Sequence, residues 1–89
     1  MRQIDHLISG GAGGAAKRFG EVFDPNNGGV QAQVALGDAA VLERAVQAAL
    51  AAQPAWAATN PQRRARVMFN FKALVEANMD SLAELLSSE

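Results

Sequence analysis

The stretch of sequence that decides the fold is residues 19–36, which read Phe-Gly-Glu-Val-Phe-Asp-Pro-Asn-Asn-Gly-Gly-Val-Gln-Ala-Gln-Val-Ala-Leu. Residues 19–23 are loosely strand-like, and residues 30–34 alternate apolar and polar side chains, as in a half-buried strand. Residues 24–29 between them are typical of a turn, because proline fixes φ while asparagine and glycine tolerate positive φ. The pattern predicts a β-hairpin. An isolated hairpin is only marginally stable in water, so this one needs a covering layer or a neighbouring sheet.

The residues before the hairpin form a short apolar segment and a glycine-rich segment. Residues 6–8 read His-Leu-Ile, and seven of the eight glycines of the chain lie between Gly10 and Gly29. The tract of residues 10–16 is so rich in glycine that a turn or loop is favoured over a regular element. We therefore expect an earlier strand and a loop that leads into the hairpin, with residues 1–37 made of strands and Gly-rich turns.

Residues 38–89 contain no glycine, are rich in Ala, Leu, Glu and Arg, and are predicted to be helical. Asp38 is a good N-cap, because its carboxylate can accept hydrogen bonds from the free backbone N–H groups of a first turn. We expect the first helix to run from there to Pro54, which should end it. Its apolar residues recur at the spacing of one helix face. They are Leu42, Ala45, Val46, Ala49 and Leu50.

Two more helices are predicted. Asn60-Pro61 is a start signal, with asparagine as the cap and proline at the first helical position. Residues 81–84, Ser-Leu-Ala-Glu, match a capping box, so a third helix should begin near Asp80 or Ser81. No closing signal follows its leucines, which leads us to expect that the chain is part of a longer one. On the second helix one arc is apolar and comprises Val67, Met68, Phe71, Leu74 and Val75.

The composition excludes several classes of function. Without cysteine, the chain has no disulfide, no thiolate metal ligand and no cysteine nucleophile. Eight basic and nine acidic residues give a net charge of −1, which provides no basic field for nucleic acid. No apolar run reaches the roughly 20 residues that span a bilayer, and Asp5 and His6 interrupt the region where a secretory signal is apolar. We expect a cytoplasmic protein, mitochondrial if the source is eukaryotic, that binds neither nucleic acid nor membrane.

The apolar residues are few for a self-sufficient core. Of 44 hydrophobic residues 19 are alanine, which leaves 25 larger side chains to offset the entropy lost when 89 residues become ordered. A chain of this length is at most one domain. Backbone pairing or a partner must contribute the remaining stability, so we expect residues 1–37 and 38–89 to form a partial domain together.

Neither the glycine-rich loop nor the histidine indicates chemistry. Residues 10–14 are followed by Ala-Ala-Lys-Arg, which lacks the Gly-Lys-Ser/Thr ending of a phosphate-binding loop. The residues after them are strand-like, whereas a dinucleotide fingerprint opens a helix. We expect a hairpin or lead-in loop here. His6 is the only histidine, and alone it cannot form a metal site; we expect it at the surface or at a strand edge.

A basic cluster and a tryptophan have structural interpretations. Arg63, Arg64 and Arg66 lie in the first turns of the second helix, where cations oppose the helix dipole. We expect them to lie on a solvated face or to form ion pairs within the fold. Trp56, in the Ala-rich connection after Pro54, is expected to be a packing anchor between helices.

The acidic residues do not form a catalytic pair. Asp38 with Glu43, and Asp80 with Glu84, are accounted for by helix capping and solvent exposure. We therefore predict no catalytic, no cofactor-binding and no metal-binding residue in this chain.

Phe69 indicates more about function than the charged residues do, because it lies outside the apolar arc of its helix, nearly opposite Val67. A helix that is apolar on two sides implies contact with material that these 89 residues do not contain. An alternative hypothesis is a stand-alone small helical interaction module, without catalysis, that presents Phe69, Met68 and Trp56 to a partner helix.

The order of these signals resembles the N-terminal segment of the aldehyde dehydrogenase superfamily. The elements follow one another as in that family: a strand, the Phe-Asp-Pro-Asn-Asn-Gly turn, a second strand, an Ala-rich helix closing on Pro-Ala-Trp, and then Arg63-Arg64. Two stretches look most like the CoA-acylating methylmalonate-semialdehyde dehydrogenase branch. They are residues 66–78, which read Arg-Val-Met-Phe-Asn-Phe-Lys-Ala-Leu-Val-Glu-Ala-Asn, and residues 5–10, which read Asp-His-Leu-Ile-Ser-Gly. The turn departs from the family, which usually has Pro-x-Thr-Gly-Glu where residues 25–29 read Pro-Asn-Asn-Gly-Gly.

The resemblance implies a fold and an activity for a longer parent protein. The fold would be an α+β fragment, with N-terminal β-hairpin strands followed by two to three amphipathic α-helices, part of the α/β cofactor-binding domain of an aldehyde dehydrogenase. In such enzymes a cysteine thiolate attacks the aldehyde, hydride passes to NAD and a thioester is released. In this branch coenzyme A accepts the acyl group, giving propionyl-CoA or acetyl-CoA with loss of the substrate carboxylate. A hydrolytic branch of the superfamily stays open as an alternative.

The resemblance also implies a scaffold role. The family's nucleophilic Cys, general-base Glu, oxyanion Asn and NAD contacts lie downstream of this stretch, and none maps onto a residue here. We expect the remainder of the parent polypeptide to be the partner, with a homo-oligomer as the full-length enzyme. NAD and coenzyme A would serve that parent, neither would bind these 89 residues, and this chain alone should be inactive.

Overall fold

The computed structural model describes residues 2–14 and 16–89, in which five strands precede three helices. The predicted α+β class is therefore confirmed. The strands are β1 (Arg2–Ile4), β2 (Leu7–Ile8), β3 (Gly11–Ala12), β4 (Arg18–Phe23) and β5 (Val30–Leu36). The helices are α1 (Ala39–Ala58), α2 (Pro61–Ala77) and α3 (Met79–Ser87).

The predicted hairpin of residues 19–36 is confirmed, and it forms most of the sheet. β4 and β5 pair antiparallel, and β1 pairs parallel with the other edge of β5, so that the sheet order is β1-β5-β4. The sequence did not predict the parallel pairing. Because β5 has a neighbour on both sides, its small residues Ala32 and Ala35 are buried, and they are the buried hydrophobic residues of the described chain.

The turn between β4 and β5 is held by its own side chains. The Asp24 carboxylate accepts a hydrogen bond from the backbone N–H of Asn26 (2.8 Å), and the Asn27 side-chain oxygen accepts one from the backbone N–H of Gly29 (2.7 Å). Gly28 has a φ of +75°, a conformation in which glycine has no steric cost. Side-chain bonds to nearby backbone groups are the reason why Asp and Asn favour turns, and they fix the hairpin here.

A second, smaller hairpin occupies the glycine-rich tract. β2 and β3 pair antiparallel, with Ser9 and Gly10 between them at φ +53° and +76°. Positive φ at both central residues is the geometry of the tightest hairpin turns. The expectation of a hairpin or lead-in loop is therefore confirmed, although Ala15 of this tract lies outside the described residues.

Helix α1 begins as predicted but ends later. The Asp38 carboxylate accepts a hydrogen bond from the N–H of Val41 (2.9 Å), as an N-cap does. The prediction that Pro54 ends the helix is wrong, because α1 continues to Ala58. Proline removes one backbone donor, and the alanines around it are strong helix formers that tolerate the loss. The helix ends where the next proline, Pro61, requires an extended residue before it.

Helices α2 and α3 meet at Asn78. Asn60 caps α2 by accepting a hydrogen bond from the N–H of Arg63 (2.9 Å), which confirms the predicted start at Pro61. The third helix begins at Met79, which confirms a start near Asp80, but the predicted capping box is wrong because Ser81 lies inside the helix. Asn78 precedes it, but its side chain donates to the carbonyl of Leu74 (2.8 Å) and so closes α2.

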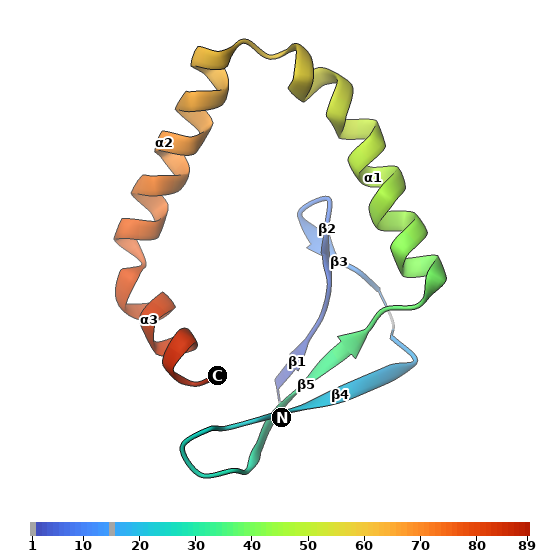
Figure 1. The fold of residues 1–89 in the computed structure, drawn as a ribbon, viewed down its shortest axis with the longest axis vertical. Coiled ribbons are helices and arrows are strands. Elements are labelled where there is room, and N and C mark those ends of the chain that lie inside the picture. Colours follow the sequence, from blue (N-terminus) through green and yellow to red (C-terminus); the bar gives the residue numbers. More distant parts are fainter. Residues whose placement is uncertain (1, 15) are drawn as a thin grey trace.

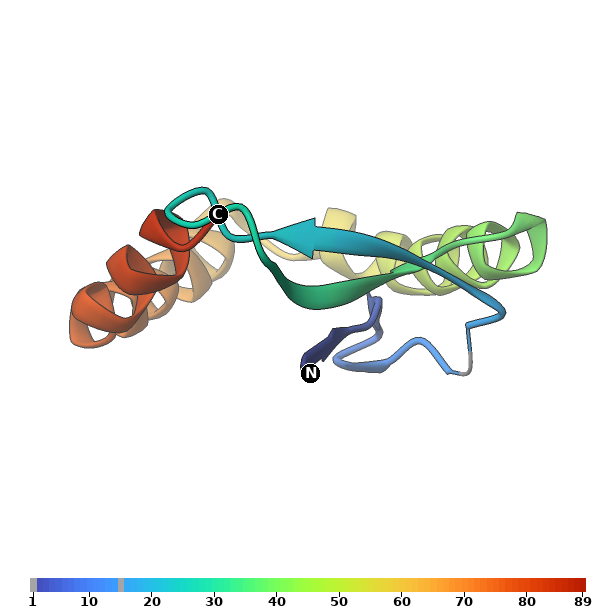
Figure 2. The same ribbon diagram turned by 90° about the horizontal axis from the view of Figure 1, so that it is seen from below.

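Strands and helices together form an open ring (Figure 1). α1 runs along one flank, α2 and α3 return along the other, and the sheet lies below. The side-chain amide of Gln31 in β5 donates a hydrogen bond to the carbonyl of Ser88 just after α3, and this bond joins the two ends of the ring. The ring is shallow, with extents of 48 × 35 × 15 Å, and the N-terminal strands leave its plane on one side (Figure 2).

The ring is larger than a compact protein of the same length. Its radius of gyration is 16.8 Å, whereas 89 residues in a compact domain give about 12 Å. Its accessible surface is 7110 Å², about 2,100 Å² more than a compact 9.3 kDa protein exposes. This excess is surface that a compact protein would have turned inward.

We predict that the purified chain, alone in solution, will not unfold cooperatively on heating. Its apolar surface is open to water, so a dye specific for exposed hydrophobic surface should bind it strongly at room temperature. Circular dichroism and dye fluorescence measure both properties. A monomer with a radius of gyration near 12 Å by X-ray scattering and a sharp melting transition would contradict this prediction.

Candidate functional site on the inside of the ring

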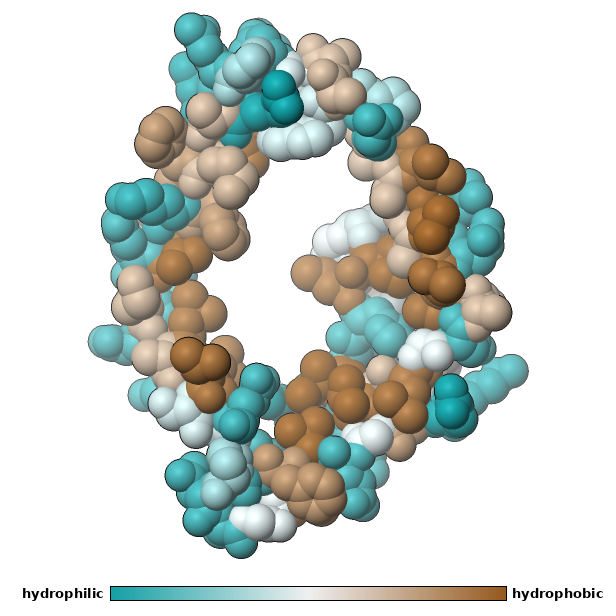
Figure 3. Space-filling view, in the orientation of Figure 1, coloured by the Kyte–Doolittle hydropathy of each residue, from teal (hydrophilic) through white to brown (hydrophobic). Residues whose placement is uncertain are grey.

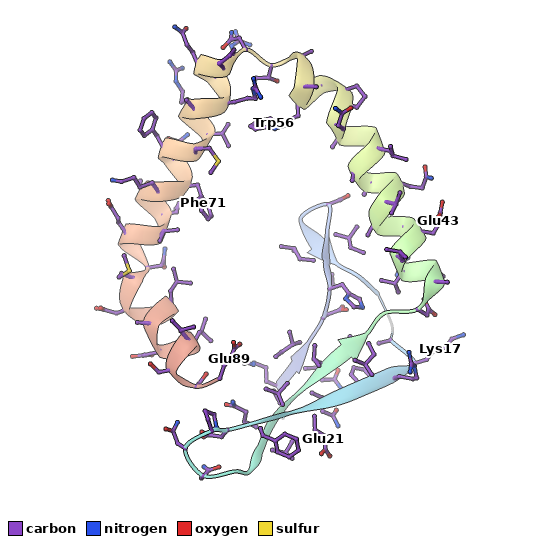
Figure 4. The ribbon with its side chains drawn as sticks, in the orientation of Figure 1. Lys17, Glu21, Glu43, Trp56, Phe71 and Glu89 are labelled. Atoms are coloured by element: carbon purple, nitrogen blue, oxygen red, sulfur yellow. The ribbon has the colours of Figure 1, made fainter. Side chains whose placement is uncertain are left out.

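One apolar arc of α2 lines the inside of the ring. Phe71 points into the ring in Figure 4. Residues three, four or seven positions apart share a helix face, so the predicted arc faces the inside with it. Its large side chains are poorly covered: Phe71 is 59% exposed and Leu74 is 64% exposed. We call Trp56 and this arc the concave face; its members are Trp56, Val67, Met68, Phe71, Leu74 and Val75.

Trp56 completes the concave face from the end of α1. Its indole points into the ring (Figure 4) and is 45% exposed. The prediction that Trp56 lies in a connection after Pro54 is wrong, because α1 continues past both residues. Figure 3 shows hydrophobic side chains along the inner rim of the ring, over α1, α2, α3 and the sheet, and shows the middle of the ring open. The concave face therefore has no cover within the described chain.

The predicted apolar face of α1 is covered only along one edge. α1 contacts β2, and its half-buried residues Val41, Ala45 and Ala48 lie on that side. Leu42 and Leu50, which the sequence placed on the covered face, are 65% and 59% exposed. Small alanines face the short β2–β3 hairpin because they let it approach, and the larger leucines beside them have no partner among the described residues.

The convex side of α2 carries Phe69 and Arg66. Phe69 lies two residues before Phe71, a rotation of about 200° around the helix, and is 69% exposed. Arg66, three residues before Phe69, shares that side and is exposed. The expected position of Phe69 outside the arc is confirmed.

Arg64 differs from the other two arginines of the basic cluster. It lies seven residues before Phe71, hence on the concave side, and it is half-buried while Arg63 and Arg66 are exposed. Its Nε is buried and has no hydrogen-bond partner among the described residues. A buried donor without an acceptor costs about 1–3 kcal/mol. Sequence reasoning did not identify this position, although the seven-residue spacing to Phe71 would have shown it.

The basic cluster has no acidic partner within this part of the fold. Among residues 2–14 and 16–89, the one ion pair joins Lys72 Nζ and Glu76 Oε1 at 2.8 Å, on the surface of α2. The expectation of ion pairs for Arg63, Arg64 and Arg66 is therefore wrong for the described residues. Arg63 and Arg66 lie on a solvated surface, which was the other expectation.

His6 directly precedes β2 and is half-buried. Its backbone carbonyl accepts a hydrogen bond from the N–H of Gly13 (2.9 Å), and a Cβ built on Gly13 would lie 2.7 Å from the His6 Cβ. The imidazole lies beside Gly37, in a groove of about 580 Å³ between the β2–β3 hairpin and the start of α1. Its Nε2 is buried without a partner among the described residues. Among the described residues no carboxylate is hydrogen-bonded to the imidazole, and the His6 side chain lies between Gly13 and Gly37.

The acidic residues behave as helix caps and surface groups. The hydrogen bond from the Val41 N–H lowers the pKa of Asp38 below its ordinary value of 3.8, and the positive charge of Lys17 acts in the same direction. Glu43 accepts a hydrogen bond from the Gln47 amide one turn later (3.0 Å). Across the described residues, no group of three potential ligands is placed to hold a metal ion. No helix in the described ranges is both long and apolar enough to cross a membrane.

Comparisons with known proteins decide the family. The model of the aldehyde dehydrogenase family matches residues 13–89. The chain belongs to the aldehyde dehydrogenase family. A malonate-semialdehyde dehydrogenase of Pseudomonas aeruginosa is 39% identical over the whole chain. A protein of Sinorhizobium meliloti 1021 named as a methylmalonate-semialdehyde dehydrogenase, crystallised with NAD, is 49% identical with a TM-score of 0.94. The methylmalonate-semialdehyde dehydrogenase of Oceanimonas doudoroffii is 39% identical with a TM-score of 0.96.

This aldehyde dehydrogenase chain corresponds to a fragment of those relatives. In each of the three comparisons the whole chain is covered, but it spans only 18% of the relative's length. The high TM-scores mean that the backbone of the open ring closely matches that of the corresponding part of two crystal structures. The resemblance found in the sequence is thereby confirmed.

The described residues of this aldehyde dehydrogenase chain do not fit an NAD site. A dinucleotide site needs a glycine-rich turn between a strand and a helix, so that the helix N-terminus meets the pyrophosphate. Here the glycine-rich turn joins two strands, β2 and β3, and the next regular element is the strand β4.

We predict that in the folded protein Asp38 titrates with a midpoint below 3.8. A lowered pKa in the folded state means that the cap's contribution to α1 is present at neutral pH and is lost as the pH falls through that midpoint. Carbon NMR of the Asp38 carboxyl measures the midpoint directly.

The control is the variant Asp38→Asn, which keeps an acceptor oxygen but does not titrate. Its first helical turn should show no pH dependence in the same range. A midpoint for Asp38 at or above 3.8 would contradict the capping role assigned to this carboxylate.

Proposed function

We propose that this chain is the N-terminal scaffold segment of an NAD-dependent, CoA-acylating methylmalonate-semialdehyde dehydrogenase. The parent would oxidise the semialdehyde with NAD and transfer the acyl group to coenzyme A, with NADH formed and the carboxylate lost as CO2 or bicarbonate. Methylmalonate semialdehyde would give propionyl-CoA, and malonate semialdehyde would give acetyl-CoA. The observation that carries this proposal is the match of the whole chain, in sequence and in backbone, to a complete relative that bears this name and was crystallised with NAD.

The role proposed for the chain itself is packing. Its concave face is an apolar surface without a cover, and the ring has about 2,100 Å² more accessible surface than a compact protein of its size. Permanent interfaces bury roughly 2,000–5,000 Å² and are rich in apolar groups. The proposed occupant of the ring is the remainder of the parent polypeptide, which is the larger part of each relative.

The chemistry is proposed to reside wholly in that remainder. The chain contains no cysteine, so it cannot supply the thiolate on which this class of reaction depends. Neither NAD nor coenzyme A is proposed to bind these residues. We further propose that the parent is a homo-oligomer located in the cytoplasm, or in mitochondria if the source is eukaryotic, without nucleic-acid or membrane partners.

The alternative of a stand-alone interaction module has less support. Such a module would present Phe69, Met68 and Trp56 to one partner helix, yet Met68 belongs to the concave face and Phe69 to the convex side of α2. One partner helix cannot contact both sides of α2 at once. A hydrolytic aldehyde dehydrogenase stays the second candidate for the parent, because the acyl acceptor depends on residues outside this chain.

We predict that this chain can replace its counterpart in a working enzyme. In the experiment, the matching residues of the Sinorhizobium meliloti protein are exchanged for this chain, which shares 49% of its residues there. We call the product the hybrid protein. It should be soluble and should form NADH from methylmalonate semialdehyde when NAD and coenzyme A are present, with acyl-CoA detected by mass spectrometry.

The controls are the unmodified Sinorhizobium meliloti protein and the isolated chain. The isolated chain should form no NADH. Turnover by the isolated chain would overturn the scaffold assignment. An inactive or insoluble hybrid protein would also overturn it, provided that the unmodified Sinorhizobium meliloti protein is active in the same assay. For the parent itself, the full-length protein that contains this chain should require coenzyme A for thioester formation, and free acid as its product would favour the hydrolytic branch.

A further inference from the structure

Arg64 is the charged residue nearest the centre of the concave side of α2, and the described chain does not neutralise it. Its neighbours on that side, one, two and three turns along the helix, are the apolar residues Met68, Phe71 and Val75. The Nε is already buried, and no described acceptor lies within hydrogen-bond distance of it. A guanidinium stays protonated at any physiological pH, so it cannot escape burial by losing its charge.

Filling the ring would bury this charge further. If the remainder of the parent polypeptide covers Phe71 and Met68, it is expected to cover Arg64 as well, because the three residues share one side of α2. A charge that is buried without a partner is strongly destabilising, whereas a paired and hydrogen-bonded one is tolerated. The positive end of the α2 dipole lies close to Arg64 and raises the local potential, which adds to the need for a negative group.

We propose that the segment of the parent polypeptide that covers α2 presents an aspartate or glutamate side chain to Arg64. The inference rests on the proposed function, because it takes the remainder of the parent as the occupant of the ring. A carboxylate is the protein group that both cancels the charge and accepts two parallel N–H bonds from the guanidinium fork. The apolar side chains around Arg64 favour a polypeptide core over a small soluble anion as the source of that charge.

The chain offers a matched control for this proposal. Arg66 belongs to the same cluster and the same helix turn, but it lies on the convex side and is exposed. Neutralising Arg66 removes the same charge from the same helix end. Any difference between the two substitutions therefore reports what the concave position contacts, because the loss of net charge and the change in helix dipole interaction are alike.

The test measures thermal unfolding of the full-length hybrid protein and of three variants, Arg64→Gln, Arg64→Lys and Arg66→Gln. Arg64→Gln should lower the melting temperature by at least about 6 °C more than Arg66→Gln. Arg64→Lys, which keeps the charge but not the bidentate fork, should fall between them. If Arg64→Gln is insoluble, the same order should appear in the soluble yields of the three variants.

A second arm identifies the partner. The charge reversal Arg64→Glu is combined with a library in which each aspartate and glutamate of the remainder is changed singly to lysine or arginine. Rescue of solubility and melting temperature at one acidic position is expected, and that position is the partner. Equal effects of Arg64→Gln and Arg66→Gln, or no rescue at any acidic position, would overturn the proposal and leave a bound anion or a backbone carbonyl as the counter-group.

Failure of this inference and failure of the proposed function give different results. An unsubstituted hybrid protein that folds and oxidises methylmalonate semialdehyde supports the function whatever Arg64 does. An unsubstituted hybrid protein that folds without that activity overturns the scaffold role and leaves the stability comparison at Arg64 intact. An unsubstituted hybrid protein that does not fold overturns the scaffold role, and the inference at Arg64 with it.

Discussion

Removal of the concave face from water is the requirement on which the rest of this structure depends. Trp56 and the apolar arc of α2 line a ring whose middle is open, and one hydrogen bond, from Gln31 to the carbonyl of Ser88, joins the ring's two ends. A single hydrogen bond contributes roughly 1 kcal/mol net, far too little to hold two long helices apart. We propose that material packed inside the ring maintains the arrangement, and the remainder of the parent polypeptide is the proposed source, because this chain spans only 18% of each solved relative.

The sequence predicted those parts of the fold that short-range interactions determine. Asp38 and Asn60 cap their helices because each has a side-chain oxygen within reach of free backbone donors three residues later. The turn after β4 follows from Asp24 and Asn27, which bond the backbone next to them. In each case the residue and its partner lie within three positions, so nothing outside the local sequence needs to be known.

Predictions failed where neighbouring helix formers or distant residues decided the outcome. Proline commonly ends a helix, yet α1 continues past Pro54 because the alanines around it are strong helix formers. Ser81 begins a capping motif, but Asn78 already marks the boundary between α2 and α3. The parallel pairing of β1 with β5 joins residues thirty positions apart, and no pattern within either strand specifies it. In the sequence, Arg64 forms one basic cluster with the exposed residues Arg63 and Arg66. Residues that are neighbours in sequence nevertheless point to different sides of a helix.

The proposal that the reacting groups lie in the remainder of the parent is compatible with the membership of this chain in an enzyme family, because scaffold and reacting groups can belong to different parts of one protein. A scaffold segment contributes to catalysis by fixing the shape of the part that holds the reacting groups. The family was recognisable from the order of the turn, the Ala-rich helix and residues 66–78, whereas the substrate and the acyl acceptor followed only from that resemblance.

Solvent accessibility of the concave face, measured in the free chain and in the hybrid protein, tests the central claim most directly. Hydroxyl-radical labelling with mass spectrometry reports Trp56, Phe71 and Phe69 separately. If the ring is filled by the remainder of the enzyme, labelling of Trp56 and Phe71 should fall several-fold in the hybrid protein, while Phe69 on the convex side should change much less. Labelling of Trp56 and Phe71 that stays as high in the folded hybrid protein as in the free chain would contradict the claim.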